Sequence, residues 1–353
     1  MAATPPAAAD GRLLVVDLAS TSRNWALRED GEAFIRDSAP AGWRTYFVRA
    51  STTSDGDGSR TPSAEALGAI ADAEAYFGFG ISRALFAAAP KLRWVHSATA
   101  GMGSLLFPEM LASDVQLTNS AGIHGPPIAE TVLAGVMHFL RGLDVALDQQ
   151  RKGLWDKSFF VSAESPLREV ADCRVLVIGA GGIGSEIATR FHALGATCVG
   201  VRRRPDRGVP PGFARVVGPD AVDAELPGCD VLVIAAPATP GTEHLMDAAR
   251  LDRLPRHAIV ANVARGSLID EAALAERLRD GRLRGAVLDV FREEPLAASS
   301  PLWQLRAALL TPHVSAVSPL RFWPRQLALF ADNWRRYVRD EPLANLVDKN
   351  AGY

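Results

Sequence analysis

The chain has 353 residues, of which 48% are hydrophobic and 22% charged, so it can bury the cores of two ordinary domains. Because 38 basic and 40 acidic side chains leave a net charge of -2, neither nucleic acid nor a membrane surface is an expected partner. Three widely spaced cysteines without a CxxC pair argue against a disulfide framework and a metal site, and they favour a cytoplasmic location. No hydrophobic run approaches the roughly 18 residues of a membrane span.

Short runs rich in β-branched and aromatic residues alternate with helical patterns in the first 120 residues, which predicts βα units. We expect strands at 12–17, 45–50, 73–79, 92–97 and 115–120. Between the second and third of these, residues 51–60 have the composition of a loop, and Thr61 followed by Pro62 predicts the start of a helix.

A helical pattern follows, with hydrophobic residues three or four positions apart, and it predicts one long amphipathic helix over 128–150. A second series of strands is expected at 173–179, 196–201, 230–236, 257–263 and 285–290. These strands are continuously hydrophobic, as is typical of parallel sheets with helices on both faces. Past residue 318 the pattern is helical again, and this segment is expected to return to the first unit.

The stretch GAGGIG, residues 179–184, lies directly between a predicted strand and a predicted helix. In this spacing Gly179 permits a tight turn, Gly181 lets the backbone approach a pyrophosphate, and Gly184 lets helix and strand pack closely. The N–H groups that begin the helix, at Gly182 and Ile183, would face the phosphates. A glycine-rich turn that binds no ligand is the weaker alternative, because a strand and a helix flank the motif.

Three arginines, Arg202, Arg203 and Arg204, follow the second strand of this series, where an NAD-binding chain carries an acidic residue. Guanidinium groups match the charge and geometry of a phosphate, so NADP(H) is the preferred cofactor, with NAD(H) as the alternative. Arg202 and Arg203 are the expected contacts of the 2′-phosphate. A solvated basic turn is the competing interpretation.

Four further residues lie at or beyond the ends of hydrophobic runs. Arg265 follows a predicted strand, Asp289 ends another with Glu294 in the loop after it, and His313 follows a further short hydrophobic run. Open α/β sheets bind ligands at the carboxyl ends of their strands. Reduction of a 2-keto acid needs a cation for the carboxylate, a proton donor for the keto oxygen, and a carboxylate that supports that donor. Together these side chains supply that set.

The motifs GAGGIG, PATPGTEHL, NVARGSLIDEAAL, LDVFREEPL and TPHVSA occur in the order and spacing of a known family. The chain resembles the D-isomer-specific 2-hydroxyacid dehydrogenases, most strongly over residues 123–316. The resemblance implies that Arg265 binds the substrate carboxylate, that His313 transfers the proton, and that Glu294 pairs with His313. It also implies that Asp289 holds the nicotinamide amide.

The resemblance extends to the loop 97–103, whose counterpart binds the substrate carboxylate through backbone N–H groups. The residues implied there are Ala100, Gly101, Met102 and Gly103. Further cofactor contacts are implied at Ala236, Pro237, Thr242, Val263 and Ala264. Two positions depart from the common family pattern: the basic stretch 202–204, and Ala316 in place of a frequent glycine.

The predicted fold class is α/β, with two doubly wound parallel-sheet domains. A Rossmann domain that binds NADP is expected over 120–318, and a smaller, discontinuous, flavodoxin-like substrate domain over 1–119 and 319–353. The active site is expected in the cleft between them, and the resemblance implies a homodimer. His96 and His124 adjoin loops expected to face that cleft and stay open as functional candidates.

The predicted activity is NADPH-dependent reduction of a 2-keto acid to a D-2-hydroxy acid, as in a glyoxylate/hydroxypyruvate reductase or a reductase of bulkier acids. A formate dehydrogenase is a weaker alternative, because that related group carries glutamine where Glu294 stands. An alternative from another class is a non-catalytic protein that senses dinucleotides. Such proteins can retain Arg265, Glu294 and His313, so these residues do not exclude it.

Overall fold

The computed structural model describes residues 11–22, 25–50, 61–102, 104–350 and 352. The chain divides into two compact units. Met1–Ile123 and Ser318–Tyr353 form the first unit, and His124–Val317 forms the second. Gly103, one of the predicted substrate-binding residues, and the predicted loop 51–60 lie outside the described residues.

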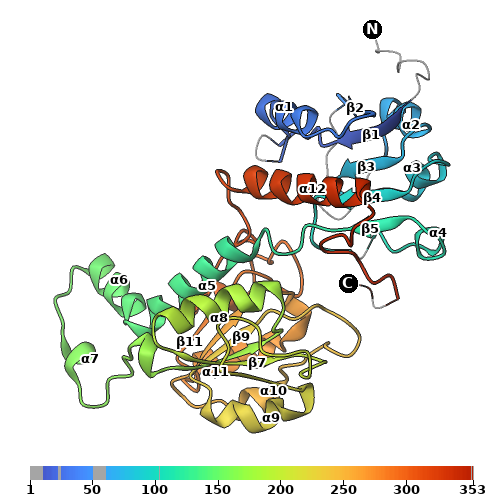
Figure 1. The fold of residues 1–353 in the computed structure, drawn as a ribbon. Helices are drawn as coiled ribbons and strands as arrows, with labels where there is room; N and C mark the ends of the chain where they lie inside the picture. Colours follow the sequence, from blue (N-terminus) through green and yellow to red (C-terminus); the bar gives the residue numbers. More distant parts are fainter. Residues whose placement is uncertain (1–10, 23–24, 51–60, 103, 351, 353) are drawn as a thin grey trace. The chain divides into compact units, whose positions relative to one another are not determined.

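The first unit is built on a five-stranded parallel sheet with the strand order β2-β1-β3-β4-β5 (Figure 1). Its strands are β1 (Arg12–Asp17), β2 (Trp43–Phe47), β3 (Ala75–Gly78), β4 (Trp94–Ser97) and β5 (Gln116–Thr118). Its helices are α1 (Glu29–Asp37), α2 (Ala64–Ile70), α3 (Arg83–Ala87), α4 (Pro108–Leu111) and α12 (Phe322–Val338). This is the strand order of a flavodoxin-like, doubly wound sheet.

Alternate residues of these strands supply two hydrophobic cores, one on each face of the sheet. Val15 belongs to one core, whereas Leu14 and Val16 belong to the other, which α12 covers. There Phe330 of α12 stacks on Phe77 at a ring distance of 4.2 Å. The C-terminal segment pairs with the free edge of β5, so that edge is protected from other chains.

The second unit contains a seven-stranded parallel sheet with the order β12-β11-β10-β9-β6-β7-β8. Its strands are β6 (Arg174–Ile178), β7 (Thr197–Val201), β8 (Arg215–Val217), β9 (Val231–Ile234), β10 (Ile259–Asn262), β11 (Gly285–Leu288) and β12 (Ala308–Leu310). Its helices are α5 (Gly125–Leu140), α6 (Leu143–Lys152), α7 (Ser158–Val161), α8 (Gly182–Ala193), α9 (Val222–Glu225), α10 (Ala248–Leu251) and α11 (Glu271–Arg279). The chain reverses direction across the sheet between β6 and β9, as in a dinucleotide-binding fold with one added strand.

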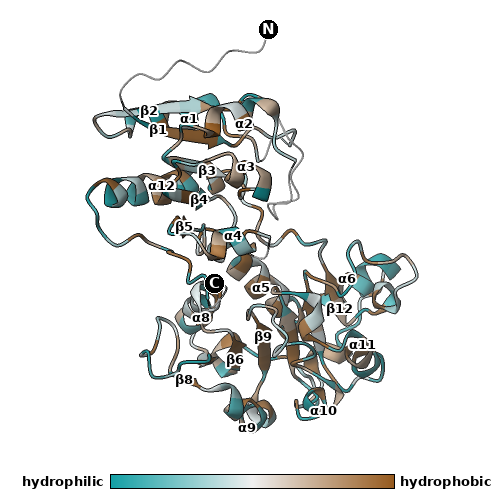
Figure 2. Ribbon diagram, turned by 90° about the vertical axis from the view of Figure 1, so that its right-hand side faces the viewer, coloured by the Kyte–Doolittle hydropathy of each residue, from teal (hydrophilic) through white to brown (hydrophobic). Residues whose placement is uncertain are grey.

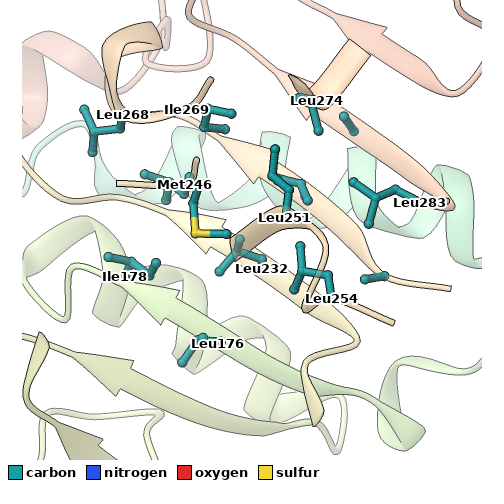
Figure 3. Close-up of a cluster of buried hydrophobic side chains, with 14 of the residues drawn as sticks. Leu176, Ile178, Leu232, Met246, Leu251, Leu254, Leu268, Ile269, Leu274 and Leu283 are labelled. Carbon is teal, nitrogen blue, oxygen red and sulfur yellow. The ribbon is translucent and has the colours of Figure 1, made fainter. Parts of the chain in front are cut away.

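Side chains of β6 again alternate between two cores. Leu176 and Ile178 belong to the same core as Leu251 of α10 and Leu274 of α11, and Figure 3 shows side chains of this cluster. The opposite core lies under α5 and α8. Figure 2 shows β9, in the middle of this sheet, as hydrophobic, and α9 and α10 with both hydrophilic and hydrophobic residues. The predicted fold class of two doubly wound parallel sheets is confirmed.

Two local predictions are wrong. The helix expected over 128–150 is two helices, because Gly142 adopts a left-handed conformation with φ 68° between α5 and α6. The helix α2 begins at Ala64, and its cap is Ser63, whose hydroxyl accepts a hydrogen bond from the N–H of Ala66 at 3.0 Å. Among the described residues, no helix is long and hydrophobic enough to span a membrane.

Candidate active site

The glycine turn after β6 leaves space at Gly181 and is tightly packed at Gly179 and Gly184. Gly179 has φ 110°, and a Cβ at Gly184 would lie 2.1 Å from the carbonyl oxygen of Gly179. A Cβ at Gly181, in contrast, would meet no heavy atom of the described residues within 4 Å. Gly181 is also the N-cap of α8 and has no side chain to accept from the first N–H groups. The N–H groups of Gly182 and Ile183, in the first turn of α8, have no acceptor within the helix and are available to an anion.

The three predicted arginines begin directly after β7, the strand beside β6. The Arg202 N–H donates to Val217 of β8 at 3.1 Å, and the Arg202 guanidinium donates to the carbonyl oxygen of Gly208. The second of these hydrogen bonds of Arg202 connects the two ends of the loop 203–207. Arg203 and Arg204 are exposed within that loop. The sequence predicts Arg202 and Arg203 as the contacts of the 2′-phosphate, whereas in the structure the Arg202 guanidinium binds the loop backbone at Gly208. Arg204 therefore joins Arg203 as a candidate contact.

Arg265 follows β10 in a turn that two neighbours fix. The buried Asn262 side chain donates to the carbonyl oxygen of Arg265 at 2.9 Å and accepts from the N–H of Ala264 at 3.1 Å. Gly266 packs directly on the loop after β11, because a Cβ there would lie 1.9 Å from the backbone of Phe291. The exposed Arg265 side chain therefore extends from a fixed turn, and its guanidinium donates to the carbonyl oxygen of Ala264 at 2.7 Å.

Glu294 and His313 form a hydrogen-bonded pair. His313 Nδ1 lies 2.7 Å from Glu294 Oε2, and Glu294 Oε1 accepts from the N–H of Phe291 at 2.9 Å. His313 adopts φ 53°, an uncommon conformation for a residue with a side chain, and its N–H donates to the carbonyl oxygen of Asp289 at 2.9 Å. With Nδ1 on the carboxylate, Nε2 is the free ring nitrogen, and the side chain is 48% exposed.

Asp289 is buried, and the loop of His313 surrounds its carboxylate. It accepts hydrogen bonds from the hydroxyl of Thr311, from the N–H groups of Val314 and Ser315, and from the hydroxyl of Ser315. These bonds fix the segment on both sides of His313. The contact of Asp289 with the nicotinamide amide remains a prediction. The hydrogen bonds by which Asp289 fixes the loop of His313 are observed.

The remaining predicted cofactor residues lie at the carboxyl ends of β9 and β10. Ala236 and Pro237 follow β9, and the Thr242 hydroxyl donates to the carbonyl oxygen of Pro237 at 2.9 Å, which closes this loop on itself. Val263 and Ala264 are buried between β10 and Arg265. All of these residues belong to the second unit, as do the glycine turn, Arg265, Glu294 and His313.

The predicted substrate loop belongs to the first unit and follows β4. Its carbonyl oxygens are engaged: Asn119 donates to that of Ala100 at 3.1 Å, and the Thr99 hydroxyl donates to that of Gly101 at 3.2 Å. None of the N–H groups of Ala100, Gly101 and Met102 donates to another described residue. We call these three N–H groups the amide nest. Successive free N–H groups of this kind attract anions.

Of the two histidines left open, His96 is buried at 0% exposure among Phe77, Trp94 and Phe330. Burial lowers the pKa of His96 to about 3, so the ring is neutral. His96 is therefore a structural residue. His124 precedes α5. Asn262 and Ser315 were not predicted as site residues, although both lie in the quoted motifs and Asn262 is near the end of a predicted strand.

The fold and the site define an α/β protein with a dinucleotide-binding sheet and a histidine–carboxylate pair. Residues 133–315 match the model of the D-isomer specific 2-hydroxyacid dehydrogenase NAD-binding domain. The chain belongs to this family, as its motifs predicted, and is thus an NAD(P)-dependent dehydrogenase by class.

The chain is 31% identical to glyoxylate/hydroxypyruvate reductase A of Salmonella newport over 275 residues, 74% of this chain and 82% of that protein. It is 32% identical to D-3-phosphoglycerate dehydrogenase of Haemophilus influenzae, and the match covers 64% of this chain but only 54% of that protein. A solved D-isomer specific 2-hydroxyacid dehydrogenase from Xanthobacter autotrophicus, in complex with NADPH and MES, has 30% identity and a TM-score of 0.76. That comparison covers 98% of this chain and 100% of the other.

Proposed function

We propose that this protein reduces 2-keto acids to D-2-hydroxy acids with NADPH. The observation that carries the proposal is the pair of His313 and Glu294, whose side chains meet at 2.7 Å on loops fixed to the Arg265 turn and to Asp289. A histidine held by a carboxylate through Nδ1 presents Nε2 as a proton donor. The relatives named glyoxylate/hydroxypyruvate reductase A support this class of substrate.

The cofactor is proposed to bind along the carboxyl ends of β6, β7, β9 and β10. The glycine turn and the start of α8 would hold the pyrophosphate, since Gly181 leaves the space that the phosphates require. Arg203 and Arg204 would bind the 2′-phosphate from the loop that Arg202 shapes. The Xanthobacter relative, solved with NADPH, supports NADP over NAD. When NADPH is bound, it supplies the hydride for the keto carbon.

Side chains of the protein would supply the proton for the keto oxygen and the positive charge for the substrate carboxylate. His313 would donate the proton from Nε2 to the keto oxygen, and Glu294 would stabilise the positive charge of the protonated ring. Arg265 would bind the substrate carboxylate, because its guanidinium offers paired donors that match a carboxylate. In the first unit, the amide nest is proposed to bind a substrate carboxylate through its backbone N–H groups. The cytoplasmic location and the homodimer remain predictions from the sequence.

The test is a spectrophotometric assay of reduced-cofactor oxidation with a panel of 2-keto acids, from glyoxylate to aromatic acids, in parallel with NADPH and NADH. Turnover of one size class with NADPH, and weaker turnover with NADH, is the expected result. Turnover with NADH alone would contradict the role of the arginines. Tight binding of NADPH without turnover of any acid would favour the dinucleotide-sensing alternative.

A further inference from the structure

Ser120, which follows β5, binds two backbone carbonyl oxygens at the start of the substrate loop. The Ser120 hydroxyl donates to the carbonyl oxygen of Ser97 at 2.7 Å, and the N–H of Ser120 donates to that of Thr99 at 3.0 Å. Ser97 and Ser120 are both at 0% exposure. The orientation of the amide nest therefore depends on where Ser120 sits.

A buried glutamine of α12 holds Ser120 in turn. The side-chain amide of Gln326 donates to the Ser120 hydroxyl oxygen at 2.7 Å, although 206 positions separate the two residues. Because the Ser120 oxygen accepts this bond, its hydroxyl hydrogen is free to point at Ser97. Gln326 thus selects the hydroxyl orientation that fixes the end of β4.

The burial of the Gln326 side-chain amide lowers the stability of the first unit. Gln326 is at 0% exposure, and its Oε1 has no hydrogen-bond partner among the described residues. A buried polar atom without a partner is destabilising, and a hydrophobic side chain of the same length would avoid that cost. The amide of Gln326 therefore contributes more to the geometry of the loop than to folding.

We propose that Gln326, acting through Ser120, is a positioning residue that presets the amide nest for the substrate carboxylate. The proposal rests on the proposed function, because it assigns the nest to the 2-keto acid. It makes the C-terminal helix a determinant of substrate affinity, while the cofactor residues, all in the second unit, are unaffected.

The experiment compares Gln326→Met with Tyr337→Phe in the full-length protein. Tyr337 lies on the same helix, and its hydroxyl donates to Glu74 at 2.9 Å, at the amino-terminal edge of the sheet, so its loss is a matched control. For Gln326→Met we expect KM for the best 2-keto acid to rise roughly fivefold to tenfold, as for the loss of one hydrogen bond. The Kd for NADPH and the Tm should change little, and Tyr337→Phe should leave KM within about twofold.

A second variant keeps the test decisive if Gln326→Met fails to fold. Ser120→Ala removes the donor to Ser97 and should raise KM by a similar factor, and the double variant should be no worse than either single one, since both act in one chain of hydrogen bonds. An unchanged KM in Gln326→Met or Ser120→Ala would overturn the proposal, as would equal losses for substrate and NADPH.

Failure of the proposed function would appear differently. If the unmodified protein turned over no 2-keto acid, calorimetric binding of oxamate, a 2-keto acid mimic, would still report on the nest. Weaker oxamate binding in Gln326→Met, with NADPH binding intact, would support the positioning role. Equal oxamate binding in both proteins would contradict it.

Discussion

Acidification is expected to destabilise the first unit through His96. The ring is at 0% exposure, its Nδ1 lies 2.8 Å from the Thr118 hydroxyl, and its Nε2 has no partner among the described residues. A second proton on this ring would therefore be a buried charge without an acceptor. Burial accordingly lowers the pKa of His96 from 6.5 to about 3.

The sign and the size of the effect follow from linkage. Because the pKa of His96 is lower in the folded state, stability is full above pH 6.5 and is lost as the pH falls, when only the unfolded chain takes up the proton. Between pH 7.5 and pH 5.0 this uptake should lower the free energy of unfolding by about 2 kcal/mol. Most of this loss occurs within the range where the folded ring stays neutral.

The assay is urea unfolding at the two pH values, followed by tryptophan fluorescence. Five of the seven tryptophans lie in the first unit, so the signal reports mainly on it. The matched variant is His96→Phe, which keeps a planar ring while the Thr118 hydroxyl retains Trp94 Nε1 as its donor at 3.0 Å. The loss of stability at pH 5.0 should be about 2 kcal/mol smaller in the variant. Equal losses in both proteins would show that the folded protein can protonate His96, and the reasoning would be refuted.

Two further predictions concern the second unit. Replacing Arg203 and Arg204 together with serine should raise KM for NADPH more than tenfold and leave KM for NADH nearly unchanged, because only NADPH carries the 2′-phosphate; equal effects on both cofactors would exclude these arginines as its ligands. Gly266→Ala should lower the stability of this unit by about 2 kcal/mol or more, since the new Cβ would lie 1.9 Å from the backbone of Phe291. Both this variant and its control, Gly218→Ala, are to be compared by Tm, and at Gly218 a Cβ meets no described heavy atom within 4 Å. Similar losses of Tm in the two variants would contradict the packing argument.

The strands were predictable because each is a short, continuous hydrophobic run between turn residues, and the two parallel sheets followed from the alternation with helices. The helix pattern over 128–150 could not reveal its break, because a hydrophobic period continues through Gly142 while the backbone conformation changes there. β8 was missed, since its three residues form an edge strand too short for a pattern. Periodicity detects long elements better than short ones.

The glycine turn and the order of Arg265, Glu294 and His313 were visible in the sequence because each follows a strand within a recognisable motif. The supporting contacts were not visible. Gln326 and Ser120 lie 206 positions apart, and their hydrogen bond exists only because α12 packs over the first sheet. Likewise, nothing local to His96 shows that three aromatic rings enclose it. The roles of Gln326, Ser120 and His96 depend on tertiary packing, which cannot be predicted from the local sequence around each residue.

The central claim is that His313, supported by Glu294, donates the proton in 2-keto acid reduction. Its most direct test is kcat for NADPH oxidation with the best 2-keto acid in the unmodified protein, in His313→Gln and in His257→Gln. His257 forms the same kind of pair, 2.7 Å from Asp230, but both residues precede their strands, so it is a matched control at the opposite edge of the sheet. We predict that His313→Gln lowers kcat by about 100-fold or more, with NADPH binding intact, and that His257→Gln stays within a few-fold. A kcat in His313→Gln close to that of the unmodified protein would contradict the account.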